Sequence, residues 1–300
     1  MAAQDRRQIK QISTADDLRE SEKEKRLFRR ELAEIFMEHF NSNSESGKFR
    51  FWPCWDSKKE SITSFESEPT AAPINSPTAD PEARGLAAAT AQCKRDVIAL
   101  AIATRGVRHV VSRGDVAAVN VPVHVETLSW SKTRDGYFHV LAKIEPLYLM
   151  LLAPRITGLV AGSNPSPIAQ WIAGLRRYVR WSFVHLPNVD FDLSRDGVLR
   201  VTGFGLNITS SMRTSTAWLG ALAMKTAKLK RICTNQNAIA CVGNVASLDE
   251  LLLLKSHGVR LIAGPVIEKP SELPGPVRAL SFTETLPMPE AEAEQMLRAV

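Results

Sequence analysis

Residues 240–265 read ACVGNVASLDELLLLKSHGVRLIAGP, and this stretch decides the predicted fold. The apolar run around its start, 238–242, is typical of a buried strand. Ser247 is a favourable N-cap for the helix that follows, and Gly258 is the kind of residue that ends one. A second apolar run, 259–263, comes next. The stretch therefore predicts a strand, a helix and a strand, as in a parallel sheet covered by helices.

The same alternation extends back to Phe49. A strand pair is predicted there, at 49–55 and 62–66, around a polar turn at 56–59. About eight strands separated by helices favour a TIM-like (β/α)8 barrel over an open doubly wound sheet. The open sheet is the weaker alternative because no Gly-rich phosphate loop follows the first strand. Further strands are predicted at 116–121, 147–153, 181–186 and 198–202, and helices at 82–104, 135–144, 163–178 and 214–230.

The two ends of the chain differ from the barrel segment in composition. Residues 16–40 are densely charged and carry an apolar stripe at helical spacing, formed by Leu18, Leu27, Phe28, Leu32, Ile35, Phe36 and Phe40. We expect an N-terminal helix with a polar linker at 1–48, a barrel at 49–270 and a Pro/Glu-rich tail at 271–300. The helix folds back on the barrel or binds a partner, and the sequence leaves both open.

The composition excludes several classes of protein. No apolar stretch reaches the roughly 18 residues of a membrane span, and the polar N-terminus does not resemble a signal peptide. We therefore expect a cytoplasmic protein. The four cysteines and six histidines lack the spacing of a zinc site, so the cysteines are expected to be reduced. A formal charge of +6 is compatible with an anionic ligand or partner.

Residues 240–270 resemble the close of an EAL domain, the barrel of cyclic-di-GMP phosphodiesterases. In that family a strand ends in Ala-Glu-Gly-Val-Glu-Thr, a helix follows, and the next strand ends in Gln-Gly before a Lys/Arg-Pro pair. Here the pair is Lys269-Pro270. The resemblance covers roughly residues 49–270 and implies an active site at the C-terminal strand ends. Three earlier stretches agree in order and spacing: the hairpin from Pro53 to Glu68, the helix from Cys93 to Leu100 and the strand end Ala118-Val119-Asn120-Val121.

The resemblance also implies a metal site. In the family, carboxylates and an Asn hold divalent metals, which activate a water for attack on a phosphodiester. Asn120 is retained here, and Glu66 or Glu68 stands in place of the signature Glu. Arg155, in Arg155-Ile156-Thr157, stands where Glu-Ile-Thr is expected, so that a cation replaces a metal ligand.

Further acidic positions of the family pattern are lost. The Asp pair expected after the fifth strand is absent near His185. Arg200-Val201-Thr202 matches Lys-Ile-Asp with the cation kept and the acid lost. Val242 and Val245 replace two acids, and Ala263 replaces the Gln. Since hard cations need oxygen ligands, chiefly carboxylates, these losses predict that two-metal hydrolysis is abolished.

The sequence therefore predicts a catalytically inactive, degenerate EAL protein, a bacterial regulator in signal transduction. It is expected to act by protein–protein interaction, through the N-terminal helix or by self-association, or as a cyclic-di-GMP receptor. Nucleic acid is not an expected partner. The candidate ligand-binding residues are Asn120, Glu66, Arg155 and Arg200, with no catalytic residue, metal ligand or cofactor predicted.

Two alternatives stay open. An active phosphodiesterase with atypical ligands would use magnesium and would need new acids to converge on Glu66 and Asn120. A barrel enzyme of another chemistry would share only the fold with EAL domains. The Val, Ala and Leu residues at most strand ends argue against that third hypothesis.

Overall fold

The computed structural model describes residues 2–42, 49–69, 81–160, 166–190, 199–215 and 217–282. For residues 2–20, 81–84 and 166 it describes the backbone alone. The linker at 43–48, the predicted helix start at 163–165 and the tail from residue 283 lie outside the described residues.

Eight strands close into a barrel in the described part of the chain. Their order is β1-β8-β7-β6-β5-β4-β3-β2, and β1 pairs back onto β2. Neighbouring strands from β2 to β8 are parallel, whereas β1 is antiparallel to both β2 and β8. The predicted barrel and its opening hairpin are thus confirmed. The strands are β1 (Phe49–Asp56), β2 (Ser61–Pro69), β3 (Ala118–His124), β4 (Leu152–Thr157), β5 (Phe183–His185), β6 (Gly203–Asn207), β7 (Ile239–Gly243) and β8 (Leu261–Ala263).

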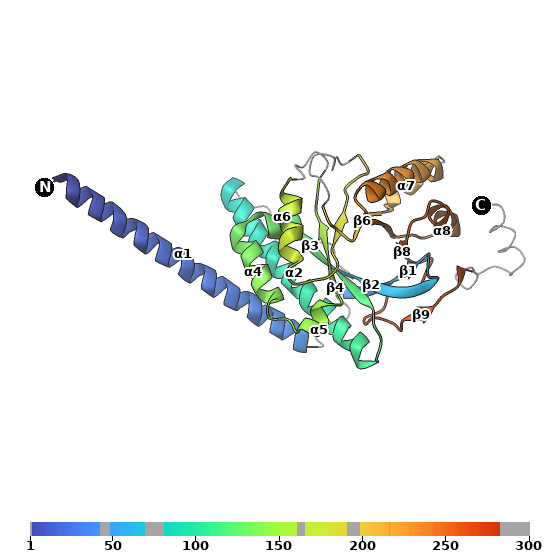
Figure 1. Cartoon of the computed structure of the whole chain (residues 1–300), viewed down its shortest axis with the longest axis horizontal. Coiled ribbons are helices and arrows are strands. Elements are labelled where there is room, and N and C mark those ends of the chain that lie inside the picture. The colour runs from blue at the N-terminus through green and yellow to red at the C-terminus, as the bar shows by residue number, and fades with distance from the viewer. Residues whose placement is uncertain are drawn as a thin grey trace, which may run out of the picture.

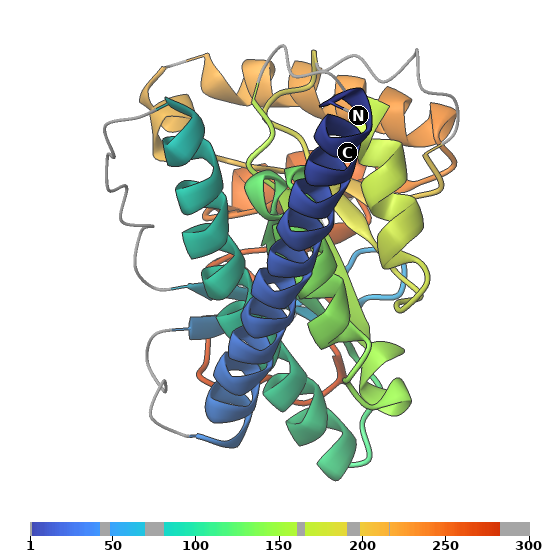
Figure 2. The same cartoon turned by 90° about the vertical axis from the view of Figure 1, so that its left-hand side faces the viewer.

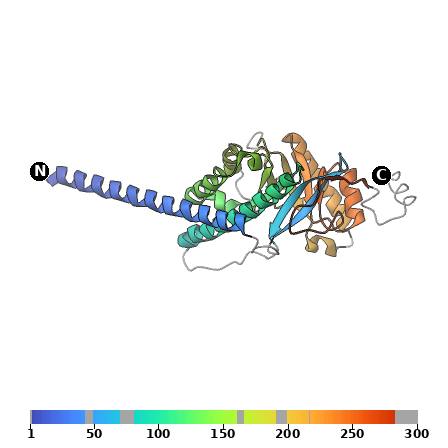
Figure 3. The ribbon, with the colours of Figure 1, turned by 90° about the horizontal axis from the view of Figure 1, so that it is seen from below.

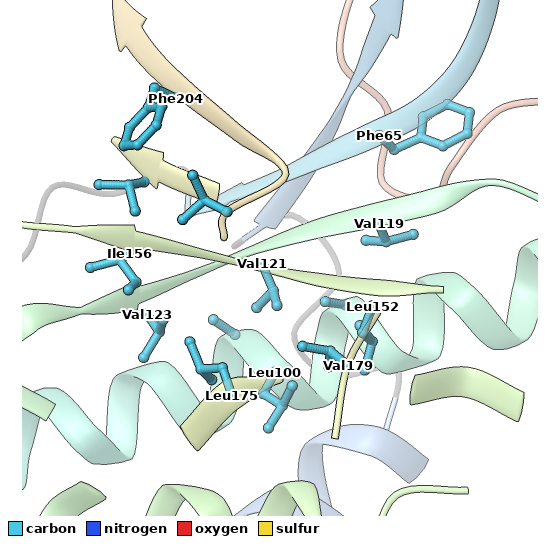
Figure 4. Packing of buried hydrophobic residues seen from close by; sticks show 14 of the residues in the cluster. Phe65, Leu100, Val119, Val121, Val123, Leu152, Ile156, Leu175, Val179 and Phe204 are labelled. Atoms are coloured by element: carbon cyan, nitrogen blue, oxygen red, sulfur yellow. The ribbon is translucent and has the colours of Figure 1, made fainter. Parts of the chain in front are cut away.

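Helices follow most of the strands and cover the outside of the barrel (Figure 1). Alternation along β3 directs Val119, Val121 and Val123 outward, into one core cluster with Leu100 and Leu175 of the helices (Figure 4). The residues between them therefore face the barrel interior. The helices are α2 (Pro81–Ser112), α3 (Val125–Ser129), α4 (Ser131–Leu141), α5 (Pro146–Leu149), α6 (Ser166–Leu175), the 3-10 helix η2 (Ser210–Thr214), α7 (Trp218–Asn235) and α8 (Leu248–Ser256).

The strand predicted at 147–153 was placed too early in the sequence. This run begins inside helix α5, where Pro146 stands in the first turn, and the strand itself is β4, at Leu152–Thr157. A short apolar run has no periodicity that distinguishes a helix from a strand, which is why the sequence misplaced it.

The strand predicted at 198–202 was also placed too early, because β6 begins at Gly203. Two glycines, Gly203 and Gly205, give this strand a low strand propensity. Gly203 is required by close packing, since a Cβ there would lie 2.8 Å from the backbone oxygen of Ile239 on β7. The segment before β6 is irregular, and Arg200 has a φ of 51° there.

The two ends of α8 match the prediction. The Ser247 hydroxyl accepts a hydrogen bond from the Glu250 N–H, and the Glu250 carboxylate accepts one from the Ser247 N–H. This capping box satisfies backbone donors that a free helix start leaves unpaired. At the other end Gly258 adopts a φ of 69°, a conformation that favours glycine.

Helix α1 (Ala2–Asn41) has two different halves (Figures 1 and 3). Its second half lies against α2 and α4, with Phe28, Leu32 and Phe36 buried (Figure 2). Gly136 of α4 permits this approach, because a Cβ there would lie 2.7 Å from Leu32 Cδ1. The first half extends away from the barrel. In the described part of the chain, no helix is long and apolar enough to cross a membrane.

Residues 271–282 pack against the barrel on the side of the β1–β2 hairpin. Phe51 and Ser271 exchange two backbone hydrogen bonds, and a short strand, β9 (Arg278–Ala279), pairs with the start of β2. Phe282 is buried with its ring centroid 6.0 Å from that of Trp55. The last described residue is therefore anchored to the barrel.

Candidate functional site

The inward-facing residues of the strands leave a small cavity inside the barrel. Its volume is about 40 Å³, which is room for a few water molecules and not for a nucleotide. It is lined by Cys54, Glu66, Asn120, Arg155, Phe183, His185, Gly205, Leu206, Asn207, Cys241, Val242, Gly243, Leu261 and Ala263. Three of the four candidate residues from the sequence, Glu66, Asn120 and Arg155, thus come together here.

Arg155 of β4 forms an ion pair with Glu66 of β2. The strand between them, β3, places Asn120 directly opposite Glu66 in register. Both partners are largely removed from water, with 14% of the Arg155 side chain and 13% of the Glu66 side chain exposed. Burial lowers the pKa of Arg155 to about 10, so the guanidinium keeps its charge at neutral pH. The interior therefore holds a cation and an anion that neutralise each other.

Asn120 and Arg155 each have a buried polar atom that finds no hydrogen-bond partner among the described residues. These atoms are Asn120 Oδ1 and Arg155 Nε, one an acceptor and the other a donor. The Asn120 main chain, in contrast, is tied to β2, because its carbonyl oxygen accepts a hydrogen bond from Ser67 Oγ at 2.9 Å. The side-chain amide of Asn120 is thus held in the cavity wall, and its oxygen can accept a further hydrogen bond.

The remaining titratable groups of the cavity are uncharged near neutral pH. Burial, and then the charge of Arg155, lowers the pKa of His185 to about 4. Burial raises the pKa of the Cys54 thiol to about 11 and that of Cys241 well above its ordinary value. A neutral imidazole and two protonated thiols offer neither a general acid at pH 7 nor a thiolate nucleophile.

A second cavity, of about 200 Å³, lies at the C-terminal mouth of the barrel. Glu66 and Asn207 line both cavities, so the mouth lies directly next to the interior cavity. Burial raises the pKa of Glu68, which also lines the mouth. The mouth residues are Trp52, Glu66, Glu68, Asn207, Gly243, Asn244, Ala263 and Gly264.

Asn207 is a site residue that the sequence did not reveal. Because β6 ends at Asn207, the counterpart of the family's Lys-Ile-Asp strand end is Gly205-Leu206-Asn207. An amide then stands where the family has an acid, and the cation is absent. Gly243 makes room for this side chain, since a Cβ on it would lie 2.3 Å from Asn207 Oδ1.

Arg200, the fourth candidate residue, is not part of the site. It is exposed and precedes β6, at the end of the barrel opposite the mouth. Its carbonyl oxygen accepts a hydrogen bond from Arg176 at 3.2 Å. The comparison of Arg200-Val201-Thr202 with Lys-Ile-Asp is therefore corrected, because it rested on the misplaced strand.

Arg213 of η2 joins two loops at the mouth, another feature that the sequence did not reveal. Its guanidinium donates to both carboxylate oxygens of Glu250, at 2.6 and 3.1 Å, and to the Asn244 carbonyl oxygen at 2.5 Å. Only 1% of the Glu250 side chain is exposed. This bidentate pair fixes the loop after β6 to the loop after β7.

The residues present do not fit the metal site that an EAL barrel implies. In the described part of the chain, no three His, Cys, Asp or Glu residues converge closely enough to hold a metal ion. Glu66 is neutralised by Arg155, and Asn120 and Asn207 supply neutral amides. Val242 and Ala263 supply no ligand atoms. A divalent cation here would face a guanidinium where a carboxylate is needed.

Comparison with known proteins bears on the fold. No family model and no curated protein matches this sequence. The Bacillus subtilis YkuI protein with an EAL domain, solved with cyclic di-GMP and calcium, has a TM-score of 0.58 at 12% identity, over 84% of this chain and 62% of that one.

Two further solved structures agree. Klebsiella pneumoniae BlrP1, in a manganese and cyclic-di-GMP complex, has a TM-score of 0.51 at 16% identity, over 79% of this chain and 60% of that one. The FimX EAL domain has a TM-score of 0.50 at 18% identity, over 80% of this chain and 96% of that one. The chain therefore has an EAL-type barrel fold.

Proposed function

We propose that this EAL-fold chain does not hydrolyse cyclic di-GMP and acts as a regulatory protein through contacts with other proteins. The ion pair between Arg155 and Glu66 carries the proposal. The guanidinium of Arg155, carried by β4, occupies the interior next to Glu66, an acid that lines both cavities. The charge that a metal would neutralise is already neutralised by the protein itself.

The energetics of a buried pair oppose metal binding. Separating Glu66 from Arg155 would leave two uncompensated charges in a barrel interior, and removing one partner of such a pair costs about 3–5 kcal/mol. The amides of Asn120 and Asn207 carry no charge to offset that cost. Without a metal there is no Lewis acid on the phosphodiester and no activated water for the attack.

The mouth also favours a protein scaffold over a cyclic-di-GMP receptor. Its volume of about 200 Å³ lies below the roughly 300–1,000 Å³ of pockets that enclose small molecules. Among the described residues, its lining includes Glu66 and Glu68 but no arginine or lysine. A dinucleotide with two phosphates would meet carboxylates at the mouth. Arg155 lies in the barrel interior instead and is already paired with Glu66.

The first half of α1 supports contact with a partner protein or with a second copy of this chain. Its backbone extends away from the barrel (Figure 3). Most of the stability of a helix in a protein comes from packing against other elements rather than from intrinsic propensity. We propose that the N-terminal half of α1 is covered in the functional assembly. The cytoplasmic location, the regulatory role and the ligand-binding roles of Asn120, Glu66 and Arg155 stay predictions.

Hydrolysis of cyclic di-GMP by the purified full chain, with magnesium or manganese, tests the proposal. We expect no turnover, and no difference from the variant Asn120→Ala with Glu66→Gln. Metal-dependent turnover that this variant loses would establish the alternative, an active phosphodiesterase with atypical ligands, for which the closeness of Glu66 and Asn120 is the supporting observation.

Calorimetric titration with cyclic di-GMP, with and without magnesium, then distinguishes a cyclic-di-GMP receptor from a protein scaffold. Binding without turnover identifies a receptor, and we expect none. If binding occurs, the variant Glu68→Gln shows whether the mouth is responsible, because removal of that acid strengthens the binding of a dianion there.

A further inference from the structure

A groove runs between the second half of α1 and the C-terminal end of α4. We call it the α1/α4 groove and define it by Arg26, Arg29, Arg30, Met37, His139 and Lys143. Ala33 and Glu34 complete its lining, and its volume is about 400 Å³. It lies on the outside of the molecule, where α1 crosses α4 (Figure 2).

The cations of this groove are largely unpaired. Arg26, Arg29 and Lys143 form no ion pair within 4 Å with a described residue, whereas Arg30 pairs with Glu34 at 2.8 Å. That pair is solvated, with 78% and 64% of the two side chains exposed, so it contributes little. Burial, and then the charges of Lys143 and Arg29, lowers the pKa of His139. The groove therefore carries an uncompensated positive charge.

The groove is also partly apolar. The apolar side chains of its lining are Ala33 and Met37, and 52% of Met37 is exposed to solvent. A flexible, polarisable methionine adapts to varied apolar side chains, which is why methionines recur at binding surfaces. A lining with both cationic and apolar side chains fits a segment that has both acidic and apolar residues.

The chain itself contains such a segment. Residues 283–300 include Glu284, Glu290, Glu292 and Glu294, against a single arginine, Arg298. Leu286, Met288, Met296 and Leu297 stand among these acids. We propose that the α1/α4 groove binds residues 283–300 of a second copy of this chain, with glutamates on its cationic side chains and an apolar side chain on Met37.

The position of Phe282 favours a second copy over the same copy. Phe282 is buried against Trp55, and in Figures 1 and 3 this end of the described chain lies across the barrel from α1. A segment that starts there would have to pass around the barrel to enter its own groove. Because donor and acceptor surfaces differ, the contact joins copies head to tail and gives chains or rings.

A nucleic acid is a less suitable occupant of this groove. Single-stranded nucleic acids are held by aromatic side chains on which bases stack, together with cations. The residues that line the groove include no Phe, Tyr or Trp, and they do include the carboxylate of Glu34. The proposal concerns a surface remote from the barrel interior, so it holds whether or not the chain hydrolyses cyclic di-GMP.

Sedimentation equilibrium of two variants of the full chain tests the proposal. The groove variant carries Arg26→Glu, Arg29→Glu and Lys143→Glu, and the tail variant carries Gln in place of Glu284, Glu290, Glu292 and Glu294. We expect the wild-type chain to associate with increasing concentration, less so at high salt, where the Debye length falls to about 3 Å at 1 M. Each variant alone should associate at least about tenfold more weakly, because the groove variant loses the cations of the contact and the tail variant loses its anions.

Mixing the two variants gives the sharpest result. The groove variant keeps a normal tail and the tail variant keeps a normal groove, so a mixture should form one-to-one dimers that neither variant forms alone. A matched control carries Lys225→Glu, Lys228→Glu and Arg231→Glu on α7, with the same change in charge, and should associate like the wild type.

Three results would overturn the proposal. The first is a wild-type chain that stays monomeric at all concentrations. The second is an association that the α7 control weakens as much as the groove variant does, since net charge alone would then explain it. The third is association that is unchanged in the tail variant, together with binding of a single-stranded oligonucleotide that the groove variant loses, which would assign the groove to nucleic acid.

Discussion

The barrel interior and the α1/α4 groove both contain arginine, but they use it in opposite ways. Inside the barrel the guanidinium of Arg155 is buried and paired with Glu66. In the groove, Arg26 and Arg29 lie at the surface with no described acid within ion-pair distance. A paired, buried charge stabilises one arrangement of the protein, whereas unpaired surface charges remain available to a partner. The difference separates an arginine that serves the fold from arginines that remain free for contacts at the surface.

The largest expected effect comes from breaking the buried pair. Arg155→Ala should lower the free energy of unfolding by about 3–5 kcal/mol, because Glu66 is left charged and unpaired in the interior. Urea denaturation measures it. Replacing both partners, with Arg155→Met and Glu66→Leu, should recover most of the loss. If the single variant costs less than about 1 kcal/mol, the pair resembles a solvated one and the contrast fails.

A smaller effect is expected at the mouth. Arg213→Ala should cost about 2–3 kcal/mol, because Glu250 loses two charged hydrogen bonds while its side chain is 1% exposed. Arg260→Ala is the matched control, since the Arg260 side chain is 38% exposed and its guanidinium donates one hydrogen bond to the described residues, to Asp56 at 3.2 Å. If both variants lower the free energy of unfolding by the same amount, the Arg213–Glu250 pair contributes no more than the more exposed Arg260–Asp56 pair.

The pH dependence of stability reports on His185. The pKa of His185 is about 4 in the folded protein, against 6.5 for an ordinary histidine. The unfolded chain therefore takes up the proton first as pH falls. This group therefore lowers stability as pH drops from about 6.5 towards 4. His185→Gln should lose less stability over that range than the wild type. Parallel curves for the two proteins from urea denaturation would contradict a buried, neutral imidazole beside Arg155.

The smallest effect on stability is expected in the groove. Arg29→Glu should change the free energy of unfolding by less than about 0.5 kcal/mol, because the side chain lacks an ion-pair partner among the described residues. The same denaturation experiment measures it. A cost of several kcal/mol would mean that Arg29 supports the packing of α1, and the groove would no longer be a surface free for a partner.

The sequence predicted the barrel from local patterns, and the EAL resemblance supplied two wall positions. Asn120 and Arg155, which lie within β3 and β4, were recognised from that family's strand-end motifs. The pairing of Arg155 with Glu66 could not be predicted, because it depends on how distant strands meet when the barrel closes. Periodicity along the chain carries no information on such contacts.

Asn207 and Arg213 were missed for a different reason. The glycines of β6 hid the strand, so its polar end at Asn207 was misplaced by several residues, and Arg200 took its part. Arg213 lies on a short 3-10 helix without an apolar pattern. Its partner Glu250 could be recognised from the sequence only as part of a helix cap, which is one of its two roles.

Manganese binding tests the central claim, that the guanidinium of Arg155 takes the place of a metal. Electron paramagnetic resonance counts the free manganese ions when the full chain is titrated with manganese. We expect all of the metal to stay free at micromolar concentrations, both for the wild type and for Glu66→Gln. One or two manganese ions bound per chain by the wild type, and lost in Glu66→Gln, would contradict this account of the barrel interior.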